Sequence, residues 1–228
     1  MFHPRLYRRN ADLTDLARPV IVVKQDDHSG PPFLFYQPPP NAVIDPQFPV
    51  PDWPLSDQGR SQMRLGLKQP WVPDLSAIYC STEQKAIDSA EILANATALP
   101  FTQIHDLGEN DRSPTGFLPP AEFEHVADPF FAPPAQSVRG WETANDAQSR
   151  IVKAISAIVE SDETHGSVAI VSHRAVGTLL SCYLAQKSIS RDSDQPPNGG
   201  GNYYAFTMNP RQSFSWWQPI DSADLSPA

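Results

Sequence analysis

Residues 167–184 read SVAIVSHRAVGTLLSCYL, and this stretch determines the fold class. Its first five residues are mostly apolar and either small or β-branched, which is typical of a short strand buried on both faces. After Ser172 and His173, the apolar residues recur at helical spacing, at Val176, Leu179 and Leu180. We therefore expect a strand followed almost at once by a helix, with a Ser-His pair at the junction.

The position of His173 favours a binding site. It follows the carboxyl end of the expected strand and precedes the first turn of the expected helix. Open α/β sheets place their ligands at the carboxyl ends of strands, and the free backbone N–H groups of a helix N-terminus favour anions. The sequence therefore predicts an anion site around His173.

Other segments repeat the alternation of strand and helix. Residues 75–80 predict a second buried strand, and Ser81 with Gln84 forms a capping-box pattern ahead of an apolar helical face. We expect further helices from Ser56 or Asp57 to about Leu67 and over residues 141–160, a short strand at 101–105, and two late strands at 202–208 and 213–217 joined by a turn at Asn209 and Pro210. This order predicts an α/β fold whose sheet is parallel in its middle, with antiparallel additions late in the chain.

Two segments compete for the first strand, VIVV at residues 20–23 and the aromatic FLFY at residues 33–36. The chain has 25 prolines, concentrated in residues 31–54 and 113–134. Proline interrupts both helix and strand, so we expect these two segments to be long ordered loops over the sheet.

Composition limits the classes of function. The 228 residues include 17 basic and 26 acidic ones, for a net charge of −9, which disfavours nucleic acid and anionic membranes as partners. No apolar run is long enough for a membrane span, and no secretory signal is recognisable. Cys80 and Cys182 lie in apolar contexts and predict buried free thiols, so we expect a cytoplasmic protein. We expect residues 1–228 to form a single domain, with 1–18 as a loosely docked extension.

Several short motifs occur in an order that resembles a known family. They are the segments LSDQGR at 55–60, YCSTEQKA at 79–86 with its AEIL continuation at 90–93, LGE at 107–109, and VAIVSH at 168–173. Together they resemble the histidine phosphatase superfamily, the phosphoglycerate-mutase-like proteins. The resemblance implies a three-layer α/β/α fold with a mostly parallel central sheet.

The resemblance also implies phosphoryl transfer without a metal or other cofactor. In that family, a histidine in an Arg-His-Gly triplet after the first strand attacks phosphorus, and an acidic residue protonates the leaving oxygen. A second histidine and two arginines hold the phosphate oxygens. Carried over to this chain, the second histidine is His173, the acid is Glu109 and the helix-borne cation is Lys85.

Two further arginines are candidate phosphate ligands. Arg174 stands where the family commonly has glycine, and it either adds a cation over the pocket or is solvated at the start of the helix. Arg112 follows Glu109 by three residues and either reaches a phosphate or lies on the surface. Lys85 itself replaces the family's arginine, which keeps the charge but loses the planar bidentate fork.

The family's nucleophile is missing. FLFY is favoured as the first strand because its distance to Leu55 suits the family's spacing, and Gln37 and Pro39 then stand at the degenerate nucleophile position. VIVV is followed instead by Lys24, Gln25 and Asp26. Neither alignment supplies an attacking imidazole. His28 is a candidate displaced nucleophile, with a solvated loop histidine as the simpler interpretation.

We therefore predict a protein with a degenerate active site that binds phosphate or a phosphorylated small molecule and has weak or no phosphatase activity. The alternative is an active phosphomonoester hydrolase that uses a substitute nucleophile.

Overall fold

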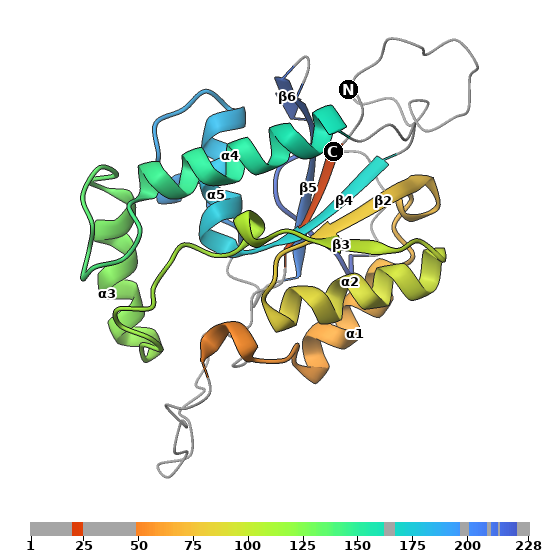
Figure 1. Cartoon of the computed structure of the whole chain (residues 1–228), viewed down its shortest axis with the longest axis horizontal. Coiled ribbons are helices and arrows are strands. Elements are labelled where there is room, and N and C mark those ends of the chain that lie inside the picture. Colours follow the sequence, from red (N-terminus) through yellow and green to blue (C-terminus); the bar gives the residue numbers. More distant parts are fainter. Residues whose placement is uncertain are drawn as a thin grey trace.

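The structure, a computed structural model, describes residues 20–24, 49–161, 167–196, 201–208, 211–213 and 215–222. Within these residues, the chain forms one seven-stranded sheet with helices on both faces (Figure 1). This is the three-layer α/β/α arrangement that the sequence predicts.

The central sheet is parallel in its middle. Its strands are β1 (Val20–Lys24), β2 (Leu75–Cys80), β3 (Phe101–Gln103), β4 (Ser167–Ser172), β5 (Asn202–Met208), β6 (Arg211–Ser213) and β7 (Gln218–Pro219). Their order is β3-β2-β4-β1-β5-β6, and β7 also pairs with β5. The first four strands pair in parallel, β5 is antiparallel to β1, and β6 and β7 are antiparallel to β5. The predicted antiparallel additions late in the chain are therefore confirmed.

Helices cover the sheet on both sides. They are α1 (Asp57–Gly66), α2 (Gln84–Thr97), α3 (Pro120–Phe131), α4 (Ala144–Ser161) and α5 (Arg174–Leu184), with single 3₁₀ turns η2 (Val50–Asp52), η3 (Val72–Asp74), η4 (His105–Leu107) and η5 (Arg191–Ser193). α1 and α2 lie on one face, and α4 and α5 lie on the other, with α3 beside them (Figure 1).

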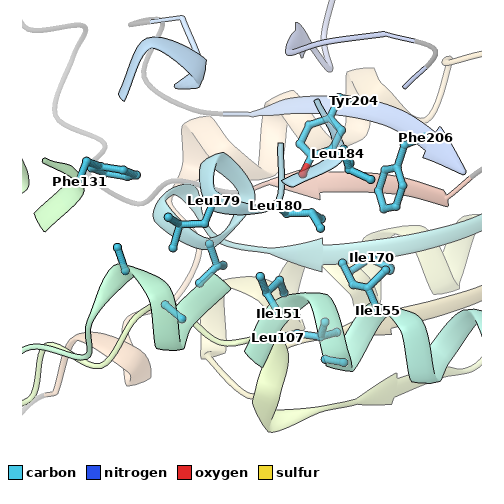
Figure 2. Packing of buried hydrophobic residues seen from close by; sticks show 14 of the residues in the cluster. Leu107, Phe131, Ile151, Ile155, Ile170, Leu179, Leu180, Leu184, Tyr204 and Phe206 are labelled. Carbon is cyan, nitrogen blue, oxygen red and sulfur yellow. The ribbon is translucent and has the colours of Figure 1, made fainter. Parts of the chain in front are cut away.

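The central strand β4 is buried along its whole length because its side chains pack alternately into two hydrophobic clusters, one on each face of the sheet. Val168 and Ile170 pack into the cluster formed with α4 and α5. Ala169 and Val171 pack into the cluster formed with α1 and α2. Figure 2 shows Ile170 beside Ile155 of α4 in the first of these cores. A strand covered on both faces has no polar alternation, which is why its sequence reads as a continuous apolar run.

The strand beside β4 is β1, at residues 20–24, so the preference for FLFY is wrong. β1 pairs with β4 from Val20 opposite Val168 to Lys24 opposite Ser172, and its other edge pairs with β5. β4 therefore has β2 and β1 as its neighbours, and residues 33–36 lie outside the described residues. The spacing argument fails because the entropy cost of a longer connection grows only slowly with its length.

Residues 113–134 are not one long loop, because α3 occupies much of this segment. Pro119 and Pro120 stand at the start of the helix, where the missing N–H of proline costs no helical hydrogen bond. Pro129 lies inside the helix, near its end. The neighbouring Phe130 is 1% exposed and packs with Trp141 in the core, so burial of the apolar face offsets the local cost of the proline.

The two predicted helix starts have different outcomes. α1 begins as expected, with Ser56 as its capping residue. The capping box at Ser81 and Gln84 is wrong, because α2 begins at Gln84 with Glu83 as its N-cap and no side-chain cap. The Ser81 hydroxyl accepts a hydrogen bond from the Glu83 backbone N–H and lies against His173 instead.

Other boundaries shift by a few residues. The helix expected over 141–160 begins at Ala144, the short strand at 101–105 ends at Gln103, and β6 occupies Arg211–Ser213 rather than residues 213–217. The predicted turn at 209–210 lies outside the described residues.

Both cysteines are buried free thiols, as predicted. Among the described residues, no helix is long and apolar enough to cross a membrane.

Candidate active site

The site is organised around His173, at the junction of β4 and α5. His173 is the N-cap of α5 with an extended backbone, and 1% of the residue is exposed. The carboxyl ends of β1 and β2 lie on either side of this junction, because both strands pair in parallel with β4. Residues that follow these strands are therefore brought to His173.

β2 contributes two buried polar side chains. Ser81 is fully buried, and its Oγ lies 2.6 Å from His173 Nε2 in a hydrogen bond. Glu83 Oε1 lies 3.2 Å from the same nitrogen. The segment after β2 thus contacts the imidazole through both a hydroxyl and a carboxylate.

Glu83 also contacts the first turn of α2 and the loop after η4. Its Oε2 lies 3.1 Å from Lys85 Nζ, and its Oε1 accepts a hydrogen bond of 2.8 Å from the Glu109 backbone N–H. One carboxylate is therefore held by His173, Lys85 and a backbone amide at once.

This environment lowers the pKa of Glu83. Burial by itself raises the pKa, but the electrostatic attraction of His173 and of Lys85, with the hydrogen bond from the Glu109 backbone, outweighs it. The pKa falls from 4.5 to about 2. Glu83 is therefore a stable anion at neutral pH.

Glu109, the predicted acid, lies at the N-terminus of α5. Its Oε2 accepts a hydrogen bond from the Ala175 N–H at 3.1 Å, and its Oε1 accepts from the Val176 N–H at 3.2 Å. The two N–H groups are donors that a helix end leaves without helical partners. Glu109 therefore occupies the helix N-terminus at which the sequence predicts an anion site.

The loop that carries Glu109 is held by Arg150 of α4. The Arg150 guanidinium donates hydrogen bonds to the backbone carbonyls of Asp106, Gly108 and Glu109, and it is paired with Glu142 at 2.8 Å. Burial lowers the pKa of Arg150, but the hydrogen bonds and charge of Glu142 raise it more, and the net direction is upward. A permanently charged group thus fixes the backbone of the acid and of the residues just before it.

The two predicted arginines already have acidic neighbours. Arg174 makes a bidentate pair with Asp194, with Nε to Oδ1 at 3.1 Å and Nη2 to Oδ2 at 2.5 Å. Arg112 Nη2 lies 4.0 Å from Glu109 Oε2, and its guanidinium lies over the rings of Phe123 and Trp141.

All five of these predicted residues line one pocket. His173, Lys85, Glu109, Arg112 and Arg174 surround it, and the remaining lining comes from Phe123, Ala127 and Phe131 of α3 together with Ala175, Arg191 and Asp194. Part of the proline-rich segment 113–134 therefore lines the pocket, as the helix α3.

The nucleophile position expected from FLFY, at Gln37 and Pro39, lies outside the described residues. The structure places Lys24, the last residue of β1, opposite Ser172, which directly precedes His173. In the sequence, Lys24 is followed by Gln25, which also lies outside the described residues, as does His28.

Sequence reasoning missed the residues that neutralise the pocket, chiefly Glu83 and Asp194. Glu83 and Ser81 had a usable signal: they follow a buried strand that can lie beside β4 in a parallel sheet, so both were candidates for the same edge as His173. Asp194 follows the single turn η5 and carries no pattern that marks it.

The chemistry available here is anion recognition. Lys85 and His173 place polar nitrogen groups at the pocket, whereas the backbone donors at the N-terminus of α5 are already bound by Glu109. Among the described residues, no group of three or more His, Cys, Asp or Glu side chains is arranged to hold a metal ion.

Comparisons with known proteins agree with this geometry. The family model of the histidine phosphatase superfamily (branch 1) matches residues 47–207, while no curated protein matches the sequence. A mycobacterial glucosyl-3-phosphoglycerate phosphatase in complex with inorganic phosphate is similar in structure, with a TM-score of 0.67 and 18% identity over 91% of this chain and 100% of that chain. YhfR of Bacillus stearothermophilus has a TM-score of 0.63 and 22% identity over 92% and 98%. A phosphoserine phosphatase of Entamoeba histolytica in complex with 3-phosphoglyceric acid has a TM-score of 0.67 and 12% identity over 90% and 100%. At these identities, the structural likeness establishes a shared fold.

Proposed function

The chain belongs to the histidine phosphatase superfamily (branch 1), and from this membership we propose that it binds phosphate, free or on a small molecule, in the pocket around His173 with little or no phosphatase activity. Two structural relatives support phosphate as the ligand, because their complexes contain inorganic phosphate and 3-phosphoglyceric acid. The cations Lys85, Arg112 and Arg174 around His173 supply groups suited to phosphate oxygens.

The register of β1 against β4 supports the proposal that the chain has little or no phosphatase activity. Lys24 lies opposite Ser172, so the residues that follow in the two strands are Gln25 and His173. In the family, the nucleophilic histidine follows the first strand and lies opposite the second histidine. In the sequence of this chain, Gln25 follows the first strand. Its side chain is an amide, which cannot form a phosphohistidine-type intermediate.

Loss of the covalent route removes the step that divides one difficult displacement into two easier ones. The remaining contacts to a phosphate still leave a small rate enhancement over water, as happens when the nucleophile of other enzymes is removed. We therefore infer a binding protein with residual hydrolysis at most.

One observation favours an active hydrolase as the second candidate. His173, Glu109 and Lys85, which correspond to the family's second histidine, acid and cation, all line the same pocket. A substitute nucleophile such as His28 would complete the set. Its signature would be turnover that passes through a covalent phosphohistidine.

We also infer a single cytoplasmic domain over residues 1–228. Two features support this: the described strands belong to one sheet, and Cys80 and Cys182 are both free and buried, as suits a reducing compartment.

Ligand binding can be tested through thermal stability. A ligand that binds only the folded chain raises its melting temperature by mass action, so inorganic phosphate or vanadate at a hundredfold excess over Kd is expected to raise Tm by roughly 5 to 10 °C. His173→Ala is expected to abolish most of this shift. His125→Ala, which removes an exposed histidine of α3, is the matched control and is expected to keep it.

Two results would contradict the proposal that the wild-type protein binds phosphate in this pocket. One is the absence of any Tm shift for the wild-type protein with phosphate and vanadate. The other is an equal shift in wild type and His173→Ala, which would place the phosphate elsewhere.

A further inference from the structure

A buried carboxylate already contacts two of the residues that line the pocket, His173 and Lys85. The Glu83 carboxylate lies 3.2 Å from His173 Nε2 and 3.1 Å from Lys85 Nζ, and it accepts the Glu109 backbone N–H at 2.8 Å. These are the kinds of donors that would hold a phosphate group, and all three converge on one side chain.

Glu83 is built into this position. The residue is 9% exposed, and its side chain is fixed from three elements: the end of β4, the first turn of α2 and the loop after η4. Its pKa of about 2 keeps it charged across the physiological range. A dianion that approaches His173 and Lys85 therefore meets a permanent negative charge.

The other cations of the pocket do not compensate for this charge. Arg174 is paired with Asp194, and Arg191 is paired with Glu124 and Asp128. Arg112 lies 4.0 Å from Glu109. Each lysine and arginine among the described residues that line the pocket thus has a carboxylate within 4.0 Å, so little positive charge is left to attract a dianion.

We propose that Glu83 is a resident anion, and that a phosphate group reaches His173 and Lys85 only by displacing its carboxylate. This inference rests on the proposed function, since it concerns the affinity of the same pocket for the same ligand. It assigns to Glu83 a role in setting that affinity, separate from any role of the missing nucleophile.

Direct binding measurements on Glu83→Gln test the proposal. The amide has nearly the same shape but no charge, and a like charge within about 4–6 Å changes ionic equilibria by one to three powers of ten. Inorganic phosphate is therefore expected to bind Glu83→Gln roughly 10- to 1000-fold more tightly than wild type by isothermal titration calorimetry. Glu122→Gln, which removes an equal charge from the exposed face of α3, is expected to leave the affinity unchanged.

A second variant distinguishes displacement from a general charge effect. In Glu83→Ala the carboxylate is removed and its space is vacated, so acetate is expected to bind there, to raise Tm and to compete with phosphate. Acetate is expected to have no such effect on wild type, where Glu83 occupies the position.

A third measurement needs no variant and covers a failure of either variant to fold. In carboxyl carbon NMR of glutamate-labelled wild type, the Glu83 resonance is expected to stay at its ionised position as the pH is lowered below 4.5, because the pKa of Glu83 is about 2. Saturation with phosphate is expected to move this resonance, because the carboxylate leaves His173 and Lys85. A resonance that stays in place while phosphate binds would overturn the proposal.

The outcomes separate this inference from the proposed function. If wild type binds phosphate and Glu83→Gln binds it no more tightly, Glu83 is not a competitor, but the pocket assignment stands. If only Glu83→Gln binds phosphate, the resident anion is confirmed in its strongest form, and phosphate is wrong as the natural ligand. If neither binds, both proposals fail.

Discussion

Glu83 is the side chain that most clearly departs from a simple phosphate pocket. The buried Glu83 carboxylate lies 3.2 Å from His173 Nε2 and 3.1 Å from Lys85 Nζ, and it accepts a hydrogen bond from a backbone amide. Such a group stabilises the folded chain, because its ionised form is preferred there more strongly than in the unfolded chain. The same contacts that would recognise a ligand therefore contribute to stability when no ligand is bound.

Acid stability should reveal this contribution. The pKa of Glu83 is lower in the folded chain, at about 2, than its ordinary value of 4.5, so the stabilisation is fully present above pH 4.5 and is lost as the pH falls towards 2. This difference between the pKa of Glu83 in the folded chain and its ordinary pKa corresponds to on the order of 3 kcal/mol of unfolding free energy at neutral pH. Glu83→Gln is therefore expected to lower the free energy of unfolding by about this amount at neutral pH, as measured by urea denaturation.

The difference between wild type and Glu83→Gln is expected to shrink steadily below pH 4.5. Glu122→Gln serves as the control, because its exposed pair with Arg139 is expected to contribute less than about 1 kcal/mol at any pH. A difference between wild type and Glu83→Gln that is independent of pH would show that the carboxylate is not held as an anion by its neighbours.

At the level of elements, hydrophobic periodicity identified the helices that have one buried face and the strands that are buried on both faces. The switch from β4 to α5, the apolar run of β2 and the helical faces of α1 and α4 could all be predicted, because burial dictates where their apolar residues recur. Tertiary packing decided the exceptions. α3 forms despite Pro129 because Phe130 and its neighbours are buried against Trp141, and local propensity carries no information about that contact.

The choice between two first strands failed for a different reason. Both VIVV and FLFY are short apolar runs, and the spacing to α1 separated them only on the assumption of an average loop length. The pairing of β1 with β4 and β5 resolves the choice through contacts that are distant in the sequence. The candidate site was easier to predict than this strand, because His173, Glu109 and Lys85 are marked by motif order. Glu83 was missed because its significance lies in three contacts that only the folded chain brings together.

The loop before α3 supplies a test at the scale of an element. Arg150 of α4 donates hydrogen bonds to three backbone carbonyls around Glu109, and it is paired with Glu142 in a partly buried position. Because hydrogen bonds to a charged group contribute about 1.5–3 kcal/mol each and are not additive, Arg150→Ala is expected to cost about 2–4 kcal/mol of unfolding free energy. Amide hydrogen exchange is expected to accelerate over residues 105–111.

Arg139→Ala is the matched control for this substitution. Arg139 makes a single ion pair with Glu122, and both side chains are nearly half exposed, so its loss is expected to cost less than about 1 kcal/mol and to leave exchange over residues 105–111 unchanged. Equal effects of the two substitutions would show that Arg150 does not hold the loop.

At the scale of the whole molecule, the parallel sheet brings the separate motifs into one site. β1, β2 and β4 end at the same edge, and the segments that follow β2 and β4 supply Ser81, Glu83, Lys85 and His173. The parallel sheet thus gathers around His173 the residues that we propose bind phosphate. On our proposal, this chain differs in the residue that follows the first strand in the sequence, Gln25, and in the carboxylate of Glu83 beside His173 and Lys85.

The most direct test of a pocket without a nucleophile is a trapping experiment on the wild-type protein. The chain is incubated with an excess of an aryl phosphate and quenched in base, which preserves phosphohistidine. Its intact mass is then measured together with the phosphate released. We predict an unmodified mass and phosphate release close to that of the uncatalysed reaction. A mass increase of one phosphoryl group, mapped to a histidine and accompanied by rapid turnover, would contradict the proposal.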